Sequence, residues 1–271
     1  MEVNMNIKLP AHLKNQWALV TGASSGIGYE CALSLAKLGM NIIITARREL
    51  ELNKLKQNIE DHHVHCKVIC LDLTTPNAAN ILRDKIKEMQ LTPYVFINNA
   101  GKGLYGDFQK QPVNEIEQML TLNITNMTLL CRTIASIMPM QSYLLLVAST
   151  ICFQPTPLYA AYAASKSYVN ALGLALNYEL KPNIHVCTLY PGMTKTEFFQ
   201  VSHQKIDPML SSLLMMDADY VANVGIKAMF KHKARVIAGF RNKLLAGFSK
   251  VTPDIITCRI IAWMFKSTRQ S

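Results

Sequence analysis

Short apolar runs alternate with longer helix-patterned segments along most of this chain of 271 residues. Each run is rich in Val, Ile or Leu and is bounded by polar or turn residues, which predicts a buried strand. The predicted strands are Trp17–Thr21, Asn41–Ala46, Lys67–Leu71, Tyr94–Asn98, Tyr143–Ala148 and His185–Tyr190. The predicted helices are Ile27–Leu38, Arg48–Glu60, Asn77–Met89, Asn114–Met138 and Tyr159–Leu180. This alternation favours an α/β fold in which helices cover both faces of a doubly wound parallel sheet.

The positive charge of the chain is concentrated at its C-terminal end. The formal net charge is +10, and residues 231–271 contain nine Lys or Arg and a single acid, Asp254. We therefore expect one α/β domain over residues 1–240 and a basic amphipathic tail over residues 241–271. No apolar stretch approaches the ~20 residues of a spanning helix. Seven cysteines without a Cys-x-x-Cys pair indicate reduced thiols and a cytoplasmic protein.

A glycine-rich turn follows the first predicted strand and opens the first predicted helix. Glycines let the backbone approach a pyrophosphate, whose charge is then stabilised at the helix N-terminus. A glycine turn alone is a weak signal, but its position after a strand in an alternating chain predicts a dinucleotide site. The candidate cofactor-binding residues of this turn are Gly22, Ser24, Ser25, Gly26, Ile27 and Gly28.

The end of the second predicted strand distinguishes between the two nicotinamide dinucleotides. An acid about 20 residues beyond the glycines would bind the ribose 2′-hydroxyl of NAD. Here the strand is followed by Arg47 and Arg48, and the nearest acid is Glu49. The planar, permanently charged guanidinium of Arg47 suits a 2′-phosphate, so NADP is favoured and NAD is the alternative. Both arginines could also be solvated residues at a helix start, although cations there oppose the helix dipole.

Tyr162 and Lys166 are four residues apart in a helix-patterned segment, so their side chains share one helix face. A positive charge ~4 Å from the phenol oxygen, at an effective dielectric constant of ~20, favours the phenolate by ~4 kcal/mol. This is about three pKa units, enough to bring a tyrosine near pH ~7, where it could act as a general acid or base. Such pairs are also common on ordinary amphipathic helices.

Several short motifs occur in a fixed order over residues 17–199. They are the glycine turn, Asn98-Asn99-Ala100-Gly101, Asn123, Ser149, Tyr162-(x)3-Lys166 and Pro191-Gly192. In this order and spacing they resemble the short-chain dehydrogenase/reductase family. More loosely, the chain resembles a subset near bacterial oxidoreductases and the 17-beta-hydroxysteroid and 3-oxoacyl-CoA reductases. The resemblance implies a Rossmann fold and an NADP-dependent oxidoreductase that acts on CH–OH groups.

The resemblance also implies a catalytic set of four residues. Tyr162 would exchange a proton with the substrate oxygen, and Lys166 would lower the pKa of Tyr162 and bind the nicotinamide ribose. Ser149 would hold the carbonyl oxygen, where its hydroxyl stabilises the developing charge. Asn123 would support a water that leads to Lys166, and the cofactor would supply the hydride.

Further cofactor contacts follow from the same resemblance. Asp72 would hydrogen-bond the adenine, with Leu73 beside it. Asn99 would line the cofactor, Gly192 and Tyr162 are also candidate cofactor-binding residues, and Thr194 would anchor the carboxamide.

The segment after Gly192 is the part of the family that varies with the substrate. We expect a lid over about residues 193–220 and a hydrophobic substrate, such as a 3-oxoacyl thioester, a steroid, or an aldehyde or ketone. The apolar residues of this region are Phe198, Phe199, Met209, Leu210, Leu213, Leu214, Met215 and Met216, together with Phe153 and Pro155. These side chains could also pack the lid against the body. The alternative function is a non-catalytic NADP-binding scaffold or sensor that acts through the tail, although an intact catalytic set argues against it.

The tail and the long helices suggest partners. Apolar and basic residues alternate over residues 241–269, which suits peripheral contact with an anionic membrane, or docking on the body or on a partner subunit. The helices Asn114–Met138 and Tyr159–Leu180 resemble those that pair subunits in the family, so a homodimer or homotetramer is expected.

Two other binding classes find little support in the sequence. A basic tail would suit nucleic acid, but no other feature points to it. A cluster of imidazole and thiol side chains, which suggests a metal site, is better explained as a solvated turn, so no metal is expected. This cluster comprises His62, His63, His65 and Cys66.

Overall fold

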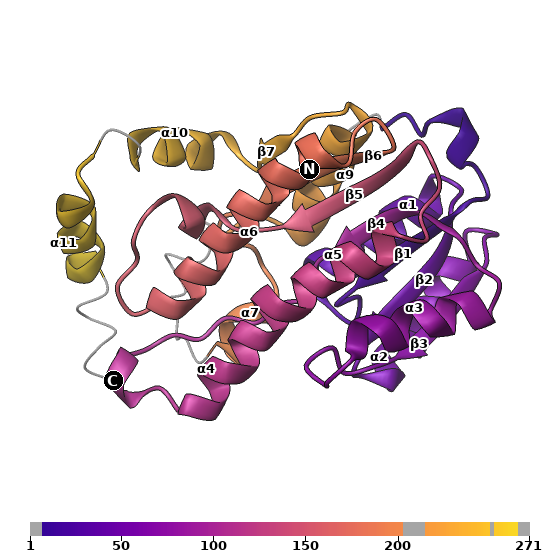
Figure 1. Ribbon diagram of the computed structural model, residues 1–271. Helices are drawn as coiled ribbons and strands as arrows, with labels where there is room; N and C mark the ends of the chain where they lie inside the picture. Colours follow the sequence, from indigo (N-terminus) through magenta and orange to yellow (C-terminus); the bar gives the residue numbers. More distant parts are fainter. Residues whose placement is uncertain (1–6, 203–214, 250–251, 265–271) are drawn as a thin grey trace.

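The computed structural model describes residues 7–202, 215–249 and 252–264. Within these ranges, seven parallel strands form one sheet in the order β3-β2-β1-β4-β5-β6-β7 (Figure 1). The strands are β1 (Trp17–Thr21), β2 (Asn41–Ala46), β3 (Cys66–Cys70), β4 (Pro93–Asn98), β5 (Ser142–Val147), β6 (Ile184–Tyr190) and β7 (Arg235–Ile237). The predicted doubly wound parallel sheet is confirmed.

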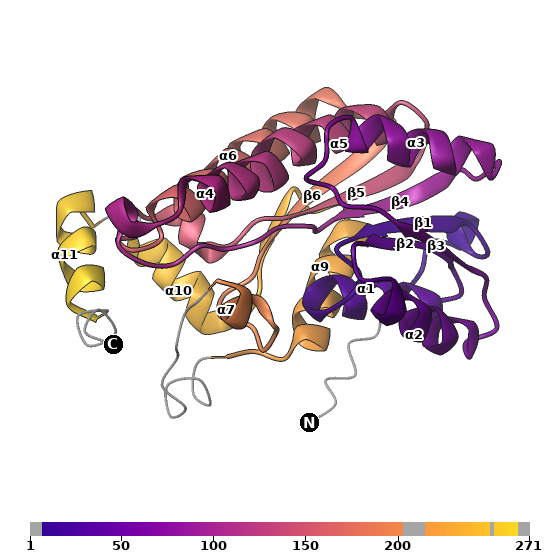
Figure 2. The ribbon, with the colours of Figure 1, turned by 90° about the horizontal axis from the view of Figure 1, so that it is seen from below.

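Helices cover both faces of this sheet (Figure 2). One face is covered by α1 (Gly26–Lys37), α2 (Glu49–Glu60) and α9 (Ala218–Phe230). The other is covered by α3 (Ala78–Glu88), α5 (Met127–Ala135) and α6 (Ala160–Glu179). Further α-helices within the described residues are α4 (Val113–Leu120), α7 (Phe198–Val201), α10 (Phe240–Ser249) and α11 (Asp254–Met264).

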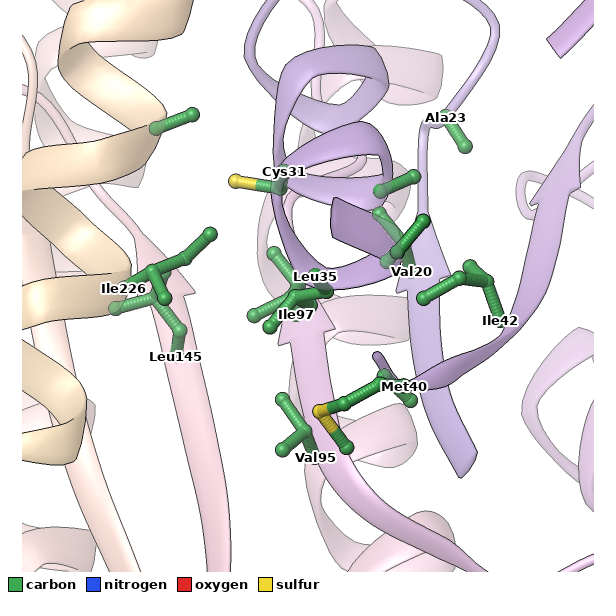
Figure 3. Close-up of a cluster of buried hydrophobic side chains, with 14 of the residues drawn as sticks. Val20, Ala23, Cys31, Leu35, Met40, Ile42, Val95, Ile97, Leu145 and Ile226 are labelled. Atoms are coloured by element: carbon green, nitrogen blue, oxygen red, sulfur yellow. The ribbon is translucent and has the colours of Figure 1, made fainter. Parts of the chain in front are cut away.

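The core consists of two apolar layers, because successive side chains of a strand point to opposite faces. Val20 and Ile42 pack towards α1, whereas Leu19 and Ile43 pack on the opposite face of the sheet. Burying an aliphatic side chain of this size contributes about 1.5–3 kcal/mol. Figure 3 shows part of the first layer, including Val20, Cys31, Leu35, Ile42, Ile97 and Ile226. The two layers hold the carboxyl ends of the strands in fixed positions.

The strand order reverses between β1 and β4, and ligands of open α/β sheets bind at such a reversal. The hydroxyl oxygen of Thr21, at the end of β1, accepts hydrogen bonds from the backbone N–H groups of Asn99 (3.0 Å) and Ala100 (3.1 Å), which follow β4. These bonds join the two strand ends that flank the expected cofactor site.

The predicted helix Asn114–Met138 differs from the structure. Here α4 and α5 are joined by a π-helical turn, Thr121–Asn126, and α5 ends at Ala135. A π turn inserts one extra residue into a helix and often marks a functional site. It contains Asn123, whose side chain is fully buried.

Candidate active site

Tyr162 and Ser149 meet at the carboxyl end of the sheet. Tyr162 lies in the first turn of α6 and is 7 % exposed, and Ser149 directly precedes the one-turn 3-10 helix Thr150–Phe153. The two hydroxyl groups are hydrogen-bonded to each other. The ring centroid of Phe198 lies 5.3 Å from that of Tyr162, and the buried side chain of Met119 belongs to the same apolar cluster. A phenol and a second hydroxyl are therefore held together in apolar surroundings.

The pKa of Tyr162 is raised above its ordinary value, and a lowering of this pKa by Lys166 stays a prediction. Burial is the largest cause of the rise, and Tyr159 adds to it, while the hydrogen bond with Ser149 acts in the opposite direction. The ammonium nitrogen of Lys166 lies over the Tyr162 ring, 5.9 Å from its centroid. Burial raises the pKa because the phenolate is the form that loses hydration. Tyr162 is thus protonated at neutral pH and able to donate its proton.

Lys166 is almost fully buried and is anchored to the sheet. Its Nζ donates to the backbone carbonyl of Val147, the last residue of β5, at 2.9 Å. Burial lowers the pKa of Lys166 to about 8, because the charged form is the one that loses hydration.

Asn123 holds the backbone at Gly101 and Lys102, which lies close to Lys166. Its Oδ1 accepts from the backbone N–H of Lys102 at 3.0 Å, and its Nδ2 donates to the carbonyl of Lys102 at 2.9 Å. A Cβ on Gly101 would lie 3.1 Å from Oδ1 of Asn123 and 3.5 Å from Nζ of Lys166. A side chain at this position would crowd Asn123, so glycine suits the close approach of the two side chains to this backbone. The π turn thus places Asn123 near Lys166, and its contact with water stays a prediction.

The glycine turn is supported by Asn99. The Nδ2 of Asn99 donates to the carbonyls of Thr21 (3.0 Å) and Gly22 (3.2 Å). Gly22 has a φ of +65°, and a Cβ there would lie 2.8 Å from that nitrogen, so a side chain would be both strained and obstructed. Asn99 therefore shapes the turn in which Gly26 and Gly28 begin α1.

The donors around this turn suit an anionic phosphate. Ser24, Ser25 and Ile27 are half-buried, and α1 has no acidic residue in its first turn. Arg47 is exposed, whereas the adjacent Arg48 donates to the hydroxyl and carbonyl oxygens of Ser24. Hydroxyl groups, a guanidinium and a helix N-terminus form a donor set suited to phosphate. Sequence reasoning chose Arg47 here and missed the contact of Arg48.

The other predicted cofactor residues are also held by their neighbours. The Oδ1 of Asp72 accepts from the N–H and the hydroxyl of Thr74, both at 2.8 Å, and the carbonyl of Leu73 accepts from the side-chain amide of Asn126. These bonds fix the loop after β3, and the contact of Asp72 with adenine stays a prediction.

The loop after β6 contacts a residue that sequence reasoning placed in the tail. The hydroxyl of Thr194 donates to the carbonyl of Gly192 at 3.0 Å. A Cβ on Gly192 would lie 2.3 Å from Nδ2 of Asn242, which belongs to α10. Met209, Leu210, Leu213 and Leu214 of the expected lid lie outside the described residues, as do residues 250–251 and 265–271 of the tail.

A family model described as short chain dehydrogenase matches residues 16–207, which include this whole set of hydroxyl, ammonium and glycine groups. The chain belongs to the short-chain dehydrogenase family. It is therefore a member of a family of oxidoreductases whose fold binds a nicotinamide cofactor. The predicted family is confirmed.

Relatives of this short-chain dehydrogenase carry several names. A very-long-chain 3-oxoacyl-CoA reductase of Scheffersomyces stipitis is 32 % identical over 190 residues, which are 65 % of this chain and 54 % of the relative. The probable short-chain type dehydrogenase/reductase VdlC of Helicobacter pylori is 26 % identical over 88 % of this chain and 93 % of its own length. The chain spans about half the length of the very-long-chain reductases that it matches.

Among solved structures, a short-chain dehydrogenase from Sphingobium yanoikuyae in complex with NADPH is similar to this chain. The TM-score is 0.75 at 26 % identity, and the match covers 87 % of this chain and 94 % of the other. No helix of the described residues is long and apolar enough to cross a bilayer. The same residues contain no group of three or more His, Cys, Asp or Glu side chains placed to hold a metal ion.

Proposed function

We propose that this short-chain dehydrogenase catalyses the NADPH-dependent reduction of a carbonyl group on a hydrophobic substrate, or the reverse oxidation of the alcohol. The observation that carries the proposal is the buried, protonated phenol of Tyr162, hydrogen-bonded to Ser149 within an apolar cluster. A carbonyl reduction needs one proton at oxygen and one hydride at carbon. The Tyr162 phenol is the group placed to supply the proton, and a charge on Lys166 would favour its transfer.

Each residue of the set has a role in this reaction. Ser149 hydrogen-bonds the carbonyl oxygen and stabilises the charge that develops there. Tyr162 donates its proton to the same oxygen. The buried ammonium of Lys166 stabilises the phenolate that remains, and Asn123 holds the adjoining backbone in place. The nicotinamide, when bound, supplies the hydride.

NADP is the proposed cofactor, and NAD is the alternative. Two arginines, Arg47 and Arg48, follow β2, and no acid is present at the position that would bind the 2′-hydroxyl of NAD. The relative from Sphingobium yanoikuyae was solved with NADPH, which supports the choice.

The proposed substrate is a 3-oxoacyl thioester, a steroid, or an aldehyde or ketone. The rings of Tyr159 and Phe198 pack against Tyr162, and Tyr105 packs against Tyr159, so these surroundings suit an apolar carbonyl compound. The name of the Scheffersomyces stipitis relative favours the thioester. The test is NADPH oxidation by the purified full chain over these three classes, with NADH in parallel. Turnover of none of them, with NADPH still bound, would contradict the proposal.

We also propose that the tail makes peripheral contact with an anionic membrane. α10 and α11 carry a large set of exposed apolar side chains, each 45–75 % exposed. They are Phe240, Leu244, Leu245, Phe248, Ile255, Ile256, Ile260 and Trp263. A cavity of about 310 Å³ between β7 and α10 is lined by the cations Lys233, Arg235 and Lys243. Apolar side chains flanked by cations suit an anionic bilayer surface.

A homodimer or homotetramer is proposed from the long helices. α5 and α6 lie side by side on one face and expose Leu129, Tyr168 and Leu174 (Figure 1). Exposed apolar groups on neighbouring helices are typical of subunit interfaces. Measuring the mass of the protein in solution tests whether it is a dimer or a tetramer. If the parent is an oligomer and the Leu129→Glu variant is a monomer, the interface includes α5.

A further inference from the structure

A single guanidinium joins the glycine turn to the segment after β6. Arg48 precedes α2, and its Nη2 lies 2.8 Å from Oε2 of Glu197, the residue before α7. The same side chain donates to the hydroxyl oxygen of Ser24 from Nε (3.3 Å) and Nη2 (3.2 Å), and to the carbonyl of Ser24 (3.3 Å). Both partners of the ion pair are about half exposed.

The carboxylate of Glu197 has surroundings like those of a bound phosphate. Ser25, the residue that precedes α1, hydrogen-bonds it, and together with Arg48 this bond holds the pKa of Glu197 below its usual range. The adjacent Thr196 also touches the turn, because a Cβ on Gly26 would lie 2.8 Å from its methyl carbon. The Glu197 carboxylate is thus bound by an arginine and a hydroxyl group at the start of a helix. The same kinds of group bind the oxygens of a phosphate.

We propose that Glu197 is a built-in competitor for the 2′-phosphate of the cofactor. To bind that phosphate through Nη2, the Arg48 guanidinium must first leave Glu197. NADH carries no 2′-phosphate, so its binding does not require this exchange. The inference rests on the proposed use of NADP, and it makes Glu197 a residue that sets how strongly the enzyme prefers NADP over NAD.

The exchange also connects cofactor binding with the substrate side. Glu197 is followed directly by Phe198, whose ring packs against Tyr162. Release of Glu197 frees the start of α7 from the glycine turn while Phe198 stays in the apolar cluster. Binding of the phosphorylated cofactor is thereby linked to the position of the segment that contacts the catalytic tyrosine.

The test compares Glu197→Gln with the parent full chain. The variant removes the charge and keeps the size of an exposed side chain, so folding is preserved. A matched control is Asp217→Asn, which removes the exposed ion pair between Lys195 and Asp217 (2.8 Å) in the same part of the chain. Isothermal titration calorimetry would give the Kd of NADPH, NADH, adenosine 2′,5′-bisphosphate and 5′-AMP for each protein.

Glu197→Gln should tighten NADPH and the bisphosphate about two- to fivefold, the range expected for an exposed ion pair. NADH and 5′-AMP should be unaffected, as should all four ligands in Asp217→Asn. An equal change for NADPH and NADH, or weaker NADPH binding, would overturn the inference. If the parent prefers NADPH but Glu197→Gln leaves the preference unchanged, only the role of Glu197 fails. If neither protein prefers NADPH, the proposed cofactor fails as well.

Discussion

The ammonium group of Lys166 donates to the backbone carbonyl of Val147 at 2.9 Å. Val147 ends β5, and Ser149 follows it by two residues, while Tyr162 lies one helical turn before Lys166 on α6. One hydrogen bond therefore ties the helix that carries Tyr162 to the end of the strand that leads to Ser149.

The buried lysine should make stability depend on pH. The folded-state pKa of Lys166 is about 8, below its ordinary value of 10.5. Between these values the unfolded chain binds a proton that the folded chain does not, so the free energy of unfolding rises with pH across this window. Relative to Lys166→Met, the parent should gain stability from pH 8 to pH 10.5, measured by urea unfolding. Parallel pH profiles for the two proteins would show that the lysine is charged in the fold throughout.

Removal of the phenol hydroxyl should abolish turnover without affecting the fold. Tyr162→Phe loses the general acid, which typically contributes about 10²- to 10⁴-fold in rate. Tyr178→Phe makes the same chemical change on the same helix at a fully solvated site, and it should retain parental activity. NADPH oxidation measures the rate, and titration with NADPH checks that the cofactor still binds. Retained turnover in Tyr162→Phe would assign the proton to another group.

Asn123 should be as important for the fold as for the chemistry. Asn123→Leu removes the partner of the N–H and of the carbonyl of Lys102, two part-buried hydrogen bonds that contribute about 0.5–1.5 kcal/mol each. We expect the free energy of unfolding to fall by about 2 kcal/mol or more. Asn58→Ala removes an exposed bond to Tyr29 and should cost less than about 1 kcal/mol. Similar unfolding midpoints for the two variants would contradict the structural role of Asn123.

Reversal of charge at the end of β2 should shift the choice of cofactor. Arg47→Asp replaces a cation suited to the 2′-phosphate with an acid suited to the 2′-hydroxyl. A charge-assisted hydrogen bond contributes about 1.5–3 kcal/mol, so the ratio of kcat/KM for NADPH over NADH should fall roughly tenfold or more. An unchanged ratio would leave Arg48 as the discriminating residue.

The exposed apolar side chains of the tail should control membrane contact. Phe248→Ser and Ile260→Ser together remove two groups, each contributing about 1.5–3 kcal/mol when fully buried. Flotation of the double variant with anionic vesicles should be at least about tenfold weaker than that of the parent. The control is Val113→Ser, which changes an exposed apolar residue of α4 and should float like the parent. Equal flotation of all three proteins would exclude the tail as the contact.

The sheet could be predicted because buried parallel strands leave a direct trace in sequence. The ranges Trp17–Thr21 and Asn41–Ala46 were predicted with the bounds that the structure has. The π turn around Asn123 could not be predicted, because hydrophobic periodicity does not reveal the contact of Asn123 with Lys102. Helix patterning predicts where a helix lies, whereas an inserted residue within it is decided by tertiary bonds.

The residues of the site were easier to predict than their electrostatics. Spacing indicated Tyr162 and Lys166 as a pair, but the sign of the pKa shift of Tyr162 depends on how much water the fold removes. The ion pair of Arg48 with Glu197 was missed because the two residues are far apart in sequence and meet only when β2 and the loop after β6 lie in one fold.

The contact between Gly192 and Asn242 has a consequence for how the chain can be divided. Because the side chain of Asn242 fills the space beside Gly192, the first turn of α10 packs against the loop after β6. A protein cut at residue 240 would therefore lose the side chain that packs against Gly192, along with the rest of its tail.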